Sequence, residues 1–530
     1  MRPHRSHRFA AVLLVAASTL SWNTARAQVP AQVQAPSEAG AKTLAAALSD
    51  GLKRWFPPQD GTTVSWKALQ VVPSGDHYAV TIPELTVKDA EGSGIWFGTV
   101  SMTVAPREGA TYAVSATLPD SIPILDKGKT EATIRLGRQR FDGLWSGGFE
   151  TFLSLDADYG DLSVTGAKND GVLRIGAVTA MSALKPDAAG APTWSGPGAL
   201  AVSKVTVTDE SKRELMSLDG LALEGTYSRV DLARVNAFQT FAQRQAAAGT
   251  EPPPAETLSA LRGLLGGASV RMRMSGLSTF EPESGTRIAL GLLSAGGGVE
   301  DLDQPLGGLS LGLEASGFSM SPAVAPTGFE PRSLQLQLGI AKLPSPALWR
   351  TIADLSALSD TLEEGEADPR QEAAMQRLMG ALSQAGTELR LDKVAMDSPA
   401  LSGSLSGAFR ATATAAQGAV GGMTVLLRGL DGAARALQPA SGKPDEETAG
   451  LLAGLAMVQA MGQPGKDDAG NETRSYKIDM TEDGRFLLNG TDMGPLLAGM
   501  GGSDEPEELD GGEYEEEEIE EQPLKKAKKN

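Results

Sequence analysis

The sequence of 530 residues lacks cysteine altogether and contains only three histidines. The absence of cysteine excludes disulfides, thiolate nucleophiles, iron–sulfur ligation and cysteine zinc sites. His4 and His7 lie in a segment that we expect to be removed, which leaves His77 as the histidine of the mature chain. An imidazole base, or a metal held by two imidazoles, therefore has at most one residue to draw on.

Aromatic residues are also scarce, at 5% of the chain, and basic residues are outnumbered by acidic ones. Few aromatic rings means few stacking platforms for a sugar cleft, although a pair of glycosidase carboxylates is a purely spatial arrangement that the sequence leaves open. The formal charge is −19, and removal of the four arginines before residue 28 makes it −23. This balance argues against nucleic acid and against anionic lipid headgroups as partners, because both would be repelled.

The first 27 residues resemble a secretory signal. Arginines precede an apolar stretch from Phe9 to Leu20, and Ala25-Arg26-Ala27 forms a small-x-small cleavage site before Gln28. An uncleaved anchor is the alternative, but twelve residues would span only about 18 Å of a hydrocarbon core of about 30 Å. We expect a signal peptide of residues 1–27 and no stable membrane span in the mature chain. Export without cysteine favours the bacterial periplasm over a eukaryotic secretory route, where exported proteins commonly contain disulfides.

The C-terminus is compositionally biased. Twelve acidic residues lie between Ser503 and Gln522, and four lysines follow them. Charge at this density cannot bury apolar area, so residues 501–530 are expected to form a disordered acidic tail.

Alternation of apolar and polar residues with a period of two dominates the rest of the chain. It is clearest at residues 132–136, 270–274, 334–340 and 401–409. Such alternation is typical of antiparallel strands that bury one face, rather than of parallel strands buried on both.

Helical periodicity appears in fewer places, around residues 232–238, 346–355, 375–382 and 451–458. Ser345 and Pro346 are suited to begin the second of these helices. The fold class predicted is α+β and β-dominated, with long antiparallel curved sheets and a few covering helices. Proline-rich linkers divide the chain into an N-terminal β-rich lobe of residues 28–230, a helical connector of 231–267 and a C-terminal α+β lobe of 268–500.

Catalytic motifs receive little support from this sequence. The pattern Gly-x-Ser-x-Gly occurs once, at Gly308 to Gly312, but there Leu309, Leu311 and Leu313 alternate with small or polar residues, which predicts a strand rather than a nucleophile elbow. A phosphate-binding loop with its lysine is absent. Asp156, Asp158 and Asp161 fail the calcium-loop spacing and are interpreted as a polar turn, and His77 as a histidine in a hairpin turn. We therefore expect a protein without enzymatic activity, metal or cofactor.

Three short stretches carry a family resemblance: Trp194 to Pro197 leading into 201–207, the segment Gly421 to Leu437, and the segment Asp479 to Leu497. Together they resemble an exported proteobacterial family, the domain of unknown function 2125. The resemblance implies a periplasmic protein and supplies no catalytic residues. More distantly, the long meander of alternating strands is similar to the AsmA-type envelope proteins, whose curved sheets have an apolar inner face, although this chain departs from them in its helical inserts and in lacking an anchor helix.

Two functions remain open from the sequence. The first is an envelope protein that binds a lipid or other apolar ligand on a curved sheet, with small residues leaving room beside larger ones in one strand: Leu401, Gly403, Leu405, Gly407 and Phe409. For that face to be a binding groove, helices such as 346–358 must leave it uncovered. The second is a structural or adaptor protein that binds other envelope proteins through sheet edges or the acidic tail.

Overall fold

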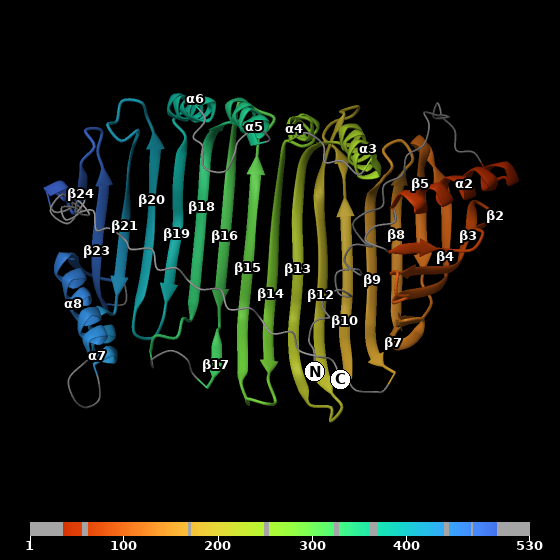
Figure 1. Cartoon of the computed structure of the whole chain (residues 1–530), viewed down its shortest axis with the longest axis horizontal. Helices are drawn as coiled ribbons and strands as arrows, with labels where there is room; N and C mark the ends of the chain where they lie inside the picture. The colour runs from red at the N-terminus through yellow and green to blue at the C-terminus, as the bar shows by residue number, and fades with distance from the viewer. Residues whose placement is uncertain are drawn as a thin grey trace, which may run out of the picture.

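The computed structural model describes residues 35–55, 62–167, 171–248, 254–322, 328–359, 369–438, 445–467 and 470–495, and Figure 1 shows their arrangement. The expected signal peptide and acidic tail lie outside these ranges. Over the described residues, 25 strands belong to one continuous sheet whose pairings are all antiparallel. The predicted β-dominated α+β fold is therefore confirmed.

The strands of the N-terminal half are β1 (Thr63–Ser65), β2 (Gln70–Ser74), β3 (His77–Lys88), β4 (Gly94–Arg107), β5 (Thr111–Thr117), β6 (Ser121–Asp126), β7 (Lys129–Arg135), β8 (Arg138–Ser146), β9 (Thr151–Gly166), β10 (Gly171–Ala183), β11 (Lys185–Pro186), β12 (Thr193–Asp209) and β13 (Glu214–Asp231). Those of the C-terminal half are β14 (Gly267–Phe280), β15 (Arg287–Glu300), β16 (Leu306–Ser316), β17 (Ser319–Ser321), β18 (Ser333–Pro344), β19 (Glu388–Asp397), β20 (Ser402–Ala411), β21 (Ala419–Arg428), β22 (Gln463–Lys466), β23 (Glu472–Met480), β24 (Phe486–Leu488) and β25 (Thr491–Asp492).

The helices are α2 (Glu38–Trp55), α3 (Leu232–Ala248), α4 (Pro254–Leu261), α5 (Ser345–Ser359), α6 (Pro369–Ala385), α7 (Leu430–Leu437) and α8 (Glu446–Met461), with one 3-10 turn at Glu108–Ala110. All four helical segments indicated by the sequence are present. α5 begins at Ser345 as expected, but the buried Ser345 hydroxyl makes no hydrogen bond within the described residues, so it does not cap the helix. Among the described helices, none is both long and apolar enough to cross a membrane.

From β9 to β23 the long strands follow one another as a single layer, which Figure 1 shows as a wide sheet with its strands upright. β13 and β14 flank the helical connector and pair directly, for example Leu221 with Met274. The two lobes inferred from the sequence therefore share one sheet.

The N-terminal strands close on themselves. β4 pairs with β5 and β6, these pair with β8 and β7 respectively, and β9 pairs with both β8 and β7. Helix α2 packs on this ring, where Leu48 joins Val80, Val104 and Trp145 in a buried cluster. The best-packed core of the molecule therefore lies at its N-terminal end.

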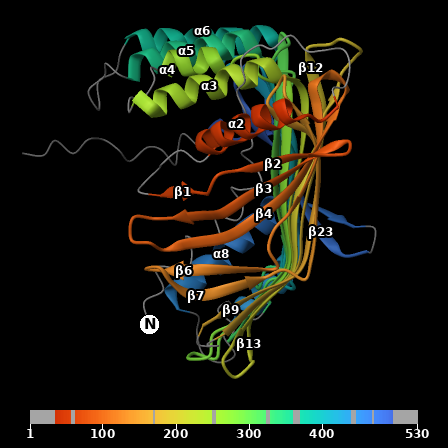
Figure 2. The same cartoon turned by 90° about the vertical axis from the view of Figure 1, so that its right-hand side faces the viewer.

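The helices lie on one side of the sheet. In Figure 2 the helices α3 to α6 project from the upper end of the sheet, and the strands β1 to β7 project from its N-terminal end, all toward the same side. This side of the sheet is framed from above and at one end, and we call it the concave side.

Two transverse lines of irregular backbone bend the long strands. The lower line includes Asp161 (φ 54), Lys204 (φ 53) and Gly276 (φ 62) on β9, β12 and β14. Between them lie Gly176 and Asp219; a Cβ at Gly176 would approach Lys204 Cβ to 2.9 Å, and one at Gly276 would approach Asp219 Oδ2 to 2.0 Å. Alternate strands thus adopt the left-handed conformation, and the strands between them approach closely.

The upper line includes Arg229 (φ 51), Asp301 (φ 53) and Lys342 (φ 56), at the ends of the strands that face the helices. At each line the spacing of apolar residues changes from two to three, as from Leu221 to Leu218 and from Tyr227 to Val230. Val230 packs with Leu232 of helix α3. The irregular residue thus keeps the apolar side chains on the concave side, where a regular strand would turn them outward.

Candidate functional site

Ten neighbouring strands, from β10 to β21, carry apolar residues on one face, which we call the middle panel. Residues that pair directly in an antiparallel sheet share a face, so the register defines its members. They are Val178, Ala180, Leu200, Val202, Leu221, Leu223, Gly225, Tyr227, Ala268, Val270, Met272, Met274, Leu293, Ala295, Gly297, Val299, Leu309, Leu311, Leu313, Ala315, Leu334, Leu336, Leu338, Ile340, Leu389, Leu391, Val394, Met396, Gly403, Leu405, Gly407, Phe409, Gly421, Met423, Val425 and Leu427.

The middle panel lies on the concave side. Tyr476 of β23 pairs with Val425 and so shares the panel's face. Its hydroxyl donates a hydrogen bond of 2.6 Å to the carbonyl oxygen of Val458 in helix α8. α8 therefore lies on the panel's side of the sheet, and Figure 2 shows α8 on the same side as α3 to α6. The panel is thus bordered by helices above and by α8 near its C-terminal end.

Among the residues that the structure describes, no second layer covers the panel. None of its side chains is buried, and Leu311 and Val270 are 54% and 51% exposed. Other large panel side chains more than a third exposed are Leu223, Tyr227, Met272, Leu334, Leu389 and Met396. The expectation that each alternating strand buries its apolar face is therefore wrong for these strands, because helices α3 to α6 cover only the ends beyond the upper bend line.

The panel is large for an exposed apolar surface. With strands about 4.8 Å apart and a rise of about 3.3 Å per residue, it measures roughly 40 Å by 25 Å. Its area of roughly 1,000 Å² exceeds the few hundred Å² of the largest apolar patch on a typical monomer. Apolar surface of this extent marks a site of interaction.

The opposite, convex face of the same strands has a different chemistry. Next to Leu311 lies Ser310, which pairs with Gly298 and Gly339, and next to Met272 lie Arg271 and Arg273. The side chains on this face are small or polar, and include serine, glycine, alanine and charged residues. The sheet therefore has one face suited to water and one suited to an apolar ligand.

The predicted site residues lie on one strand of this surface. Gly403, Leu405, Gly407 and Phe409 belong to the middle panel, opposite residues of β19 and β21 such as Val394 and Val425. Leu401 precedes β20, and its carbonyl oxygen accepts hydrogen bonds from the amide and hydroxyl of Ser398. Leu401 therefore belongs to the turn that leads into the strand rather than to the panel.

Sequence reasoning identified a single strand of a surface that spans ten. The signal for the others was present, since residues 270–274 and 334–340 show the same alternation. What the alternation does not say is which strands are neighbours and whether a second layer packs on them. Those two facts turn separate half-apolar strands into one continuous surface.

The C-terminal edge of the sheet is closed by the chain itself. β22 pairs with the first half of β23 and β24 with the second half. At the gap between them, the Asn489 side chain accepts a hydrogen bond of 2.8 Å from the Lys477 amide, and the Asn489 amide donates one of 2.7 Å to the Lys477 carbonyl. β23 is therefore covered along its outer side, and the edge that an adaptor protein would use at this end is formed by the short strands β22, β24 and β25.

The other groups singled out from the sequence do not form a catalytic arrangement. His77 lies at a β2–β3 hairpin, 3.0 Å from the exposed Asp76 carboxylate, and its hydrogen bond lowers the pKa of Asp76. Asp156 and Asp158 lie within strand β9, paired with Arg140 and Arg138, so their interpretation as a turn is wrong. In a pleated strand alternate residues share a face, so Asp156 and Asp158 lie together on the polar face of β9. Closely spaced carboxylates therefore do not by themselves indicate a turn. Within the described ranges, no group of acidic or histidine side chains has a metal-binding arrangement.

Comparison with protein-family models, with curated proteins and with solved structures gives no match for this chain. The similarity to the domain of unknown function 2125 and to AsmA-type proteins therefore stays a prediction.

Proposed function

We propose that this chain is a non-enzymatic periplasmic envelope protein that holds flexible apolar chains, such as lipid acyl chains, on the middle panel. The observation that carries the proposal is the exposure of Leu311, Val270 and their neighbours on a framed apolar surface of roughly 1,000 Å². Burial of that surface by a ligand is favourable by about 25 cal/mol per Å².

The panel's surroundings favour a flexible ligand over a flat protein partner. Helices α3 to α6 and the N-terminal strands project from the sheet on the panel's side, as Figure 2 shows, and would hold a second rigid sheet away from it. The panel's backbone groups are paired within the sheet, as Leu311 and its neighbours illustrate, so the surface offers little polar recognition. A flexible ligand that needs no hydrogen-bond partners fits a surface with projecting borders and few free polar groups.

The dimensions also suit acyl chains. A hydrocarbon core of about 30 Å contains two layers of chains, so one chain is about 15 Å long. The panel, about 25 Å high and about 40 Å wide, would accommodate several such chains side by side. Because the chain carries a formal charge of −19, zwitterionic or uncharged lipids are favoured over anionic ones.

The periplasmic location is supported by the signal-like residues 1–27 and by the absence of cysteine. The family resemblance points the same way.

The test is a matched pair of substitutions on adjacent positions of β16. Leu311→Glu places a charge on the panel, and Ser310→Glu places the same charge on the convex face. Both positions are exposed, so both variants are expected to keep the wild-type melting temperature within a few degrees. We expect lipid extraction and native mass spectrometry of protein purified from its own periplasm to show apolar ligand on wild type and Ser310→Glu, and little on Leu311→Glu.

Leu405→Glu extends the test to the strand that the sequence singled out, with Ser404→Glu as its control on the opposite face. Loss of ligand with an intact melting transition would again support the proposal. Wild-type protein that carries no apolar ligand, or equal ligand on both members of a pair, would reject it and leave the adaptor function.

A further inference from the structure

A second concave site lies at the upper border of the sheet, apart from the middle panel. It is an open cleft of about 510 Å³ between helices α4 and α5 and the connection from β15 to β16. Arg234 and Arg262 come from α3 and the end of α4, Asp303 and Gln304 from the connection, and Trp349 from α5. The volume lies within the range of small-molecule sites.

The charged residues that line the cleft differ in their contacts. Asp303 is engaged by Arg229, whose Nε and Nη2 donate hydrogen bonds of 3.0 and 2.8 Å to its two oxygens. Arg234 lies 3.3 Å from the Asp231 carboxylate. Arg262, by contrast, has an exposed side chain with no ion pair or hydrogen bond within the described part of the chain, and its carbonyl oxygen accepts a hydrogen bond of 3.3 Å from Arg234 Nη1. The chain as a whole is acidic, so attraction of an anion to this cleft has to come from the local guanidinium, which can donate two parallel hydrogen bonds to one.

The other residues that line the cleft indicate what kind of anion it would accept. Trp349 lines the cleft and is half-buried, and Leu302, Pro305 and Pro346 add apolar surface. Ser259 and Gln304 add two polar groups that can form hydrogen bonds. A guanidinium matches a carboxylate by two parallel hydrogen bonds, and an indole stacks on a flat ring.

We propose that this cleft binds a small aromatic carboxylate, with the carboxylate on Arg262 and the ring against Trp349. The site is separate from the middle panel and does not depend on the proposed binding of apolar chains.

The test is titration of the full chain with benzoate, followed by calorimetry or ligand-observed NMR. Benzyl alcohol serves as the uncharged analogue and inorganic phosphate as the anion without a ring. We expect benzoate to bind at least tenfold more tightly than either. Arg262→Ala should weaken benzoate binding at least tenfold, and Trp349→Leu should weaken it several-fold.

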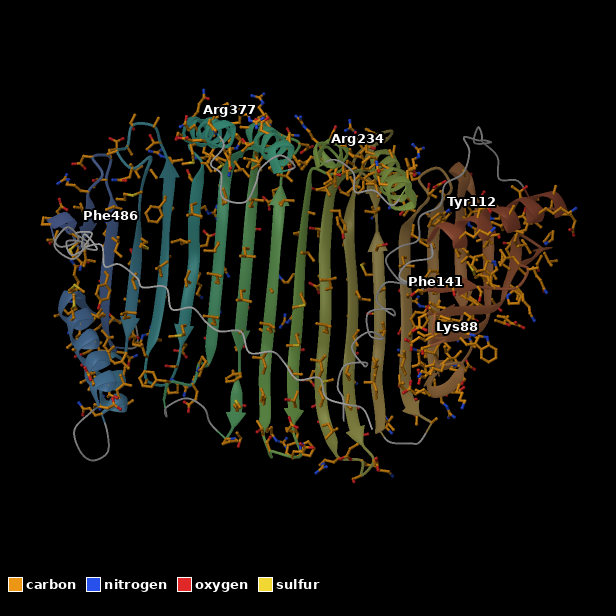
Figure 3. The ribbon with its side chains drawn as sticks, in the orientation of Figure 1. Lys88, Tyr112, Phe141, Arg234, Arg377 and Phe486 are labelled. Carbon is orange, nitrogen blue, oxygen red and sulfur yellow. The ribbon has the colours of Figure 1, made fainter. Side chains whose placement is uncertain are left out.

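Arg377→Ala is the matched control, because Arg377 is an exposed arginine on α6 that pairs with Asp354 outside the cleft. Figure 3 shows Arg377 at the same helical border of the molecule as Arg234. The control should leave benzoate binding unchanged. The proposal is overturned if benzoate does not bind, if benzyl alcohol or phosphate binds as well, or if folded Arg262→Ala protein binds benzoate like wild type.

Discussion

Arg229 shows how a single side chain stabilises a bend in this sheet. Its guanidinium donates to Asp301 at 2.7 Å and to both oxygens of Asp303, and its own backbone amide donates to the Ser195 hydroxyl at 2.9 Å. These bonds join β13 to the connection after β15 and to β12. A residue in left-handed conformation is thereby anchored to two neighbouring segments, which offsets its backbone strain.

Arg229→Gln is expected to destabilise the protein by about 1 kcal/mol at pH 7, a value reduced from that of a buried charged bond because the guanidinium is partly exposed. Arg229 lowers the pKa of Asp303 through its hydrogen bonds. A carboxyl with a lowered pKa contributes stability above its unfolded pKa and loses it as the pH falls through the folded value. The gap between wild type and variant should therefore narrow below about pH 4, the ordinary range of aspartate. Urea unfolding at pH 7 and pH 3 measures this, and a gap that widens in acid would contradict it.

At the scale of elements, the lower bend line decides which face of each strand is apolar. Lys204 has φ 53, and the apolar positions on either side of it, Val202 and Val205, are three residues apart. Val205 pairs with Ile175 and Leu218, which are also displaced by one position relative to the panel. Several neighbouring strands thus show the same three-residue spacing of apolar residues at the same level of the sheet.

A β-branched residue at this position should be costly. Lys204→Val is expected to lose about 1 to 3 kcal/mol of stability, because valine tolerates the left-handed conformation poorly. Lys204→Gly should be at least as stable as wild type. Ser203→Val, one residue away and outside the left-handed conformation, is the control, with a change of about 0.5 kcal/mol or less. Equal stability of the two valine variants in urea would argue against the bend.

At the scale of the whole molecule, buried apolar contacts are distributed unevenly along the sheet. The closed ring of N-terminal strands and helix α2 contain buried clusters around Leu48, Ile82 and Ile95. From β14 to β21 most of the panel touches only neighbouring strands and solvent. Such quasi-one-dimensional arrays lose cooperativity over their length, as repeat proteins do.

We expect hydrogen exchange to follow this gradient. Amides of β3, β4 and β9 should exchange more slowly than those of β19, β20 and β21, because opening of the panel strands exposes less apolar area. Peptide-level exchange followed by mass spectrometry measures both groups in one experiment. Binding of apolar chains to the panel should slow exchange in its strands selectively. Uniform protection along the chain would contradict the gradient.

The local sequence pattern was sufficient to predict which segments of this protein form strands and helices. The alternation at residues 270–274 and 334–340 predicted antiparallel strands, and the spacing around residues 346–355 predicted helix α5, because both periodicities follow from backbone geometry alone. Composition was sufficient to exclude cysteine chemistry.

Only the tertiary structure decided what these elements form together. The pairing of β13 with β14 joined the two expected lobes into one sheet, and the position of α5 at its upper border left Leu311 and Val270 uncovered. The cleft beside Arg262 likewise brings together residues of α3, α4, α5 and a strand connection that lie up to 115 positions apart, from Arg234 to Trp349. The alternation in a strand is the same whether its apolar face meets another layer, a ligand or water. The difference between core and binding surface depends on the packing of distant segments, and no local pattern records it.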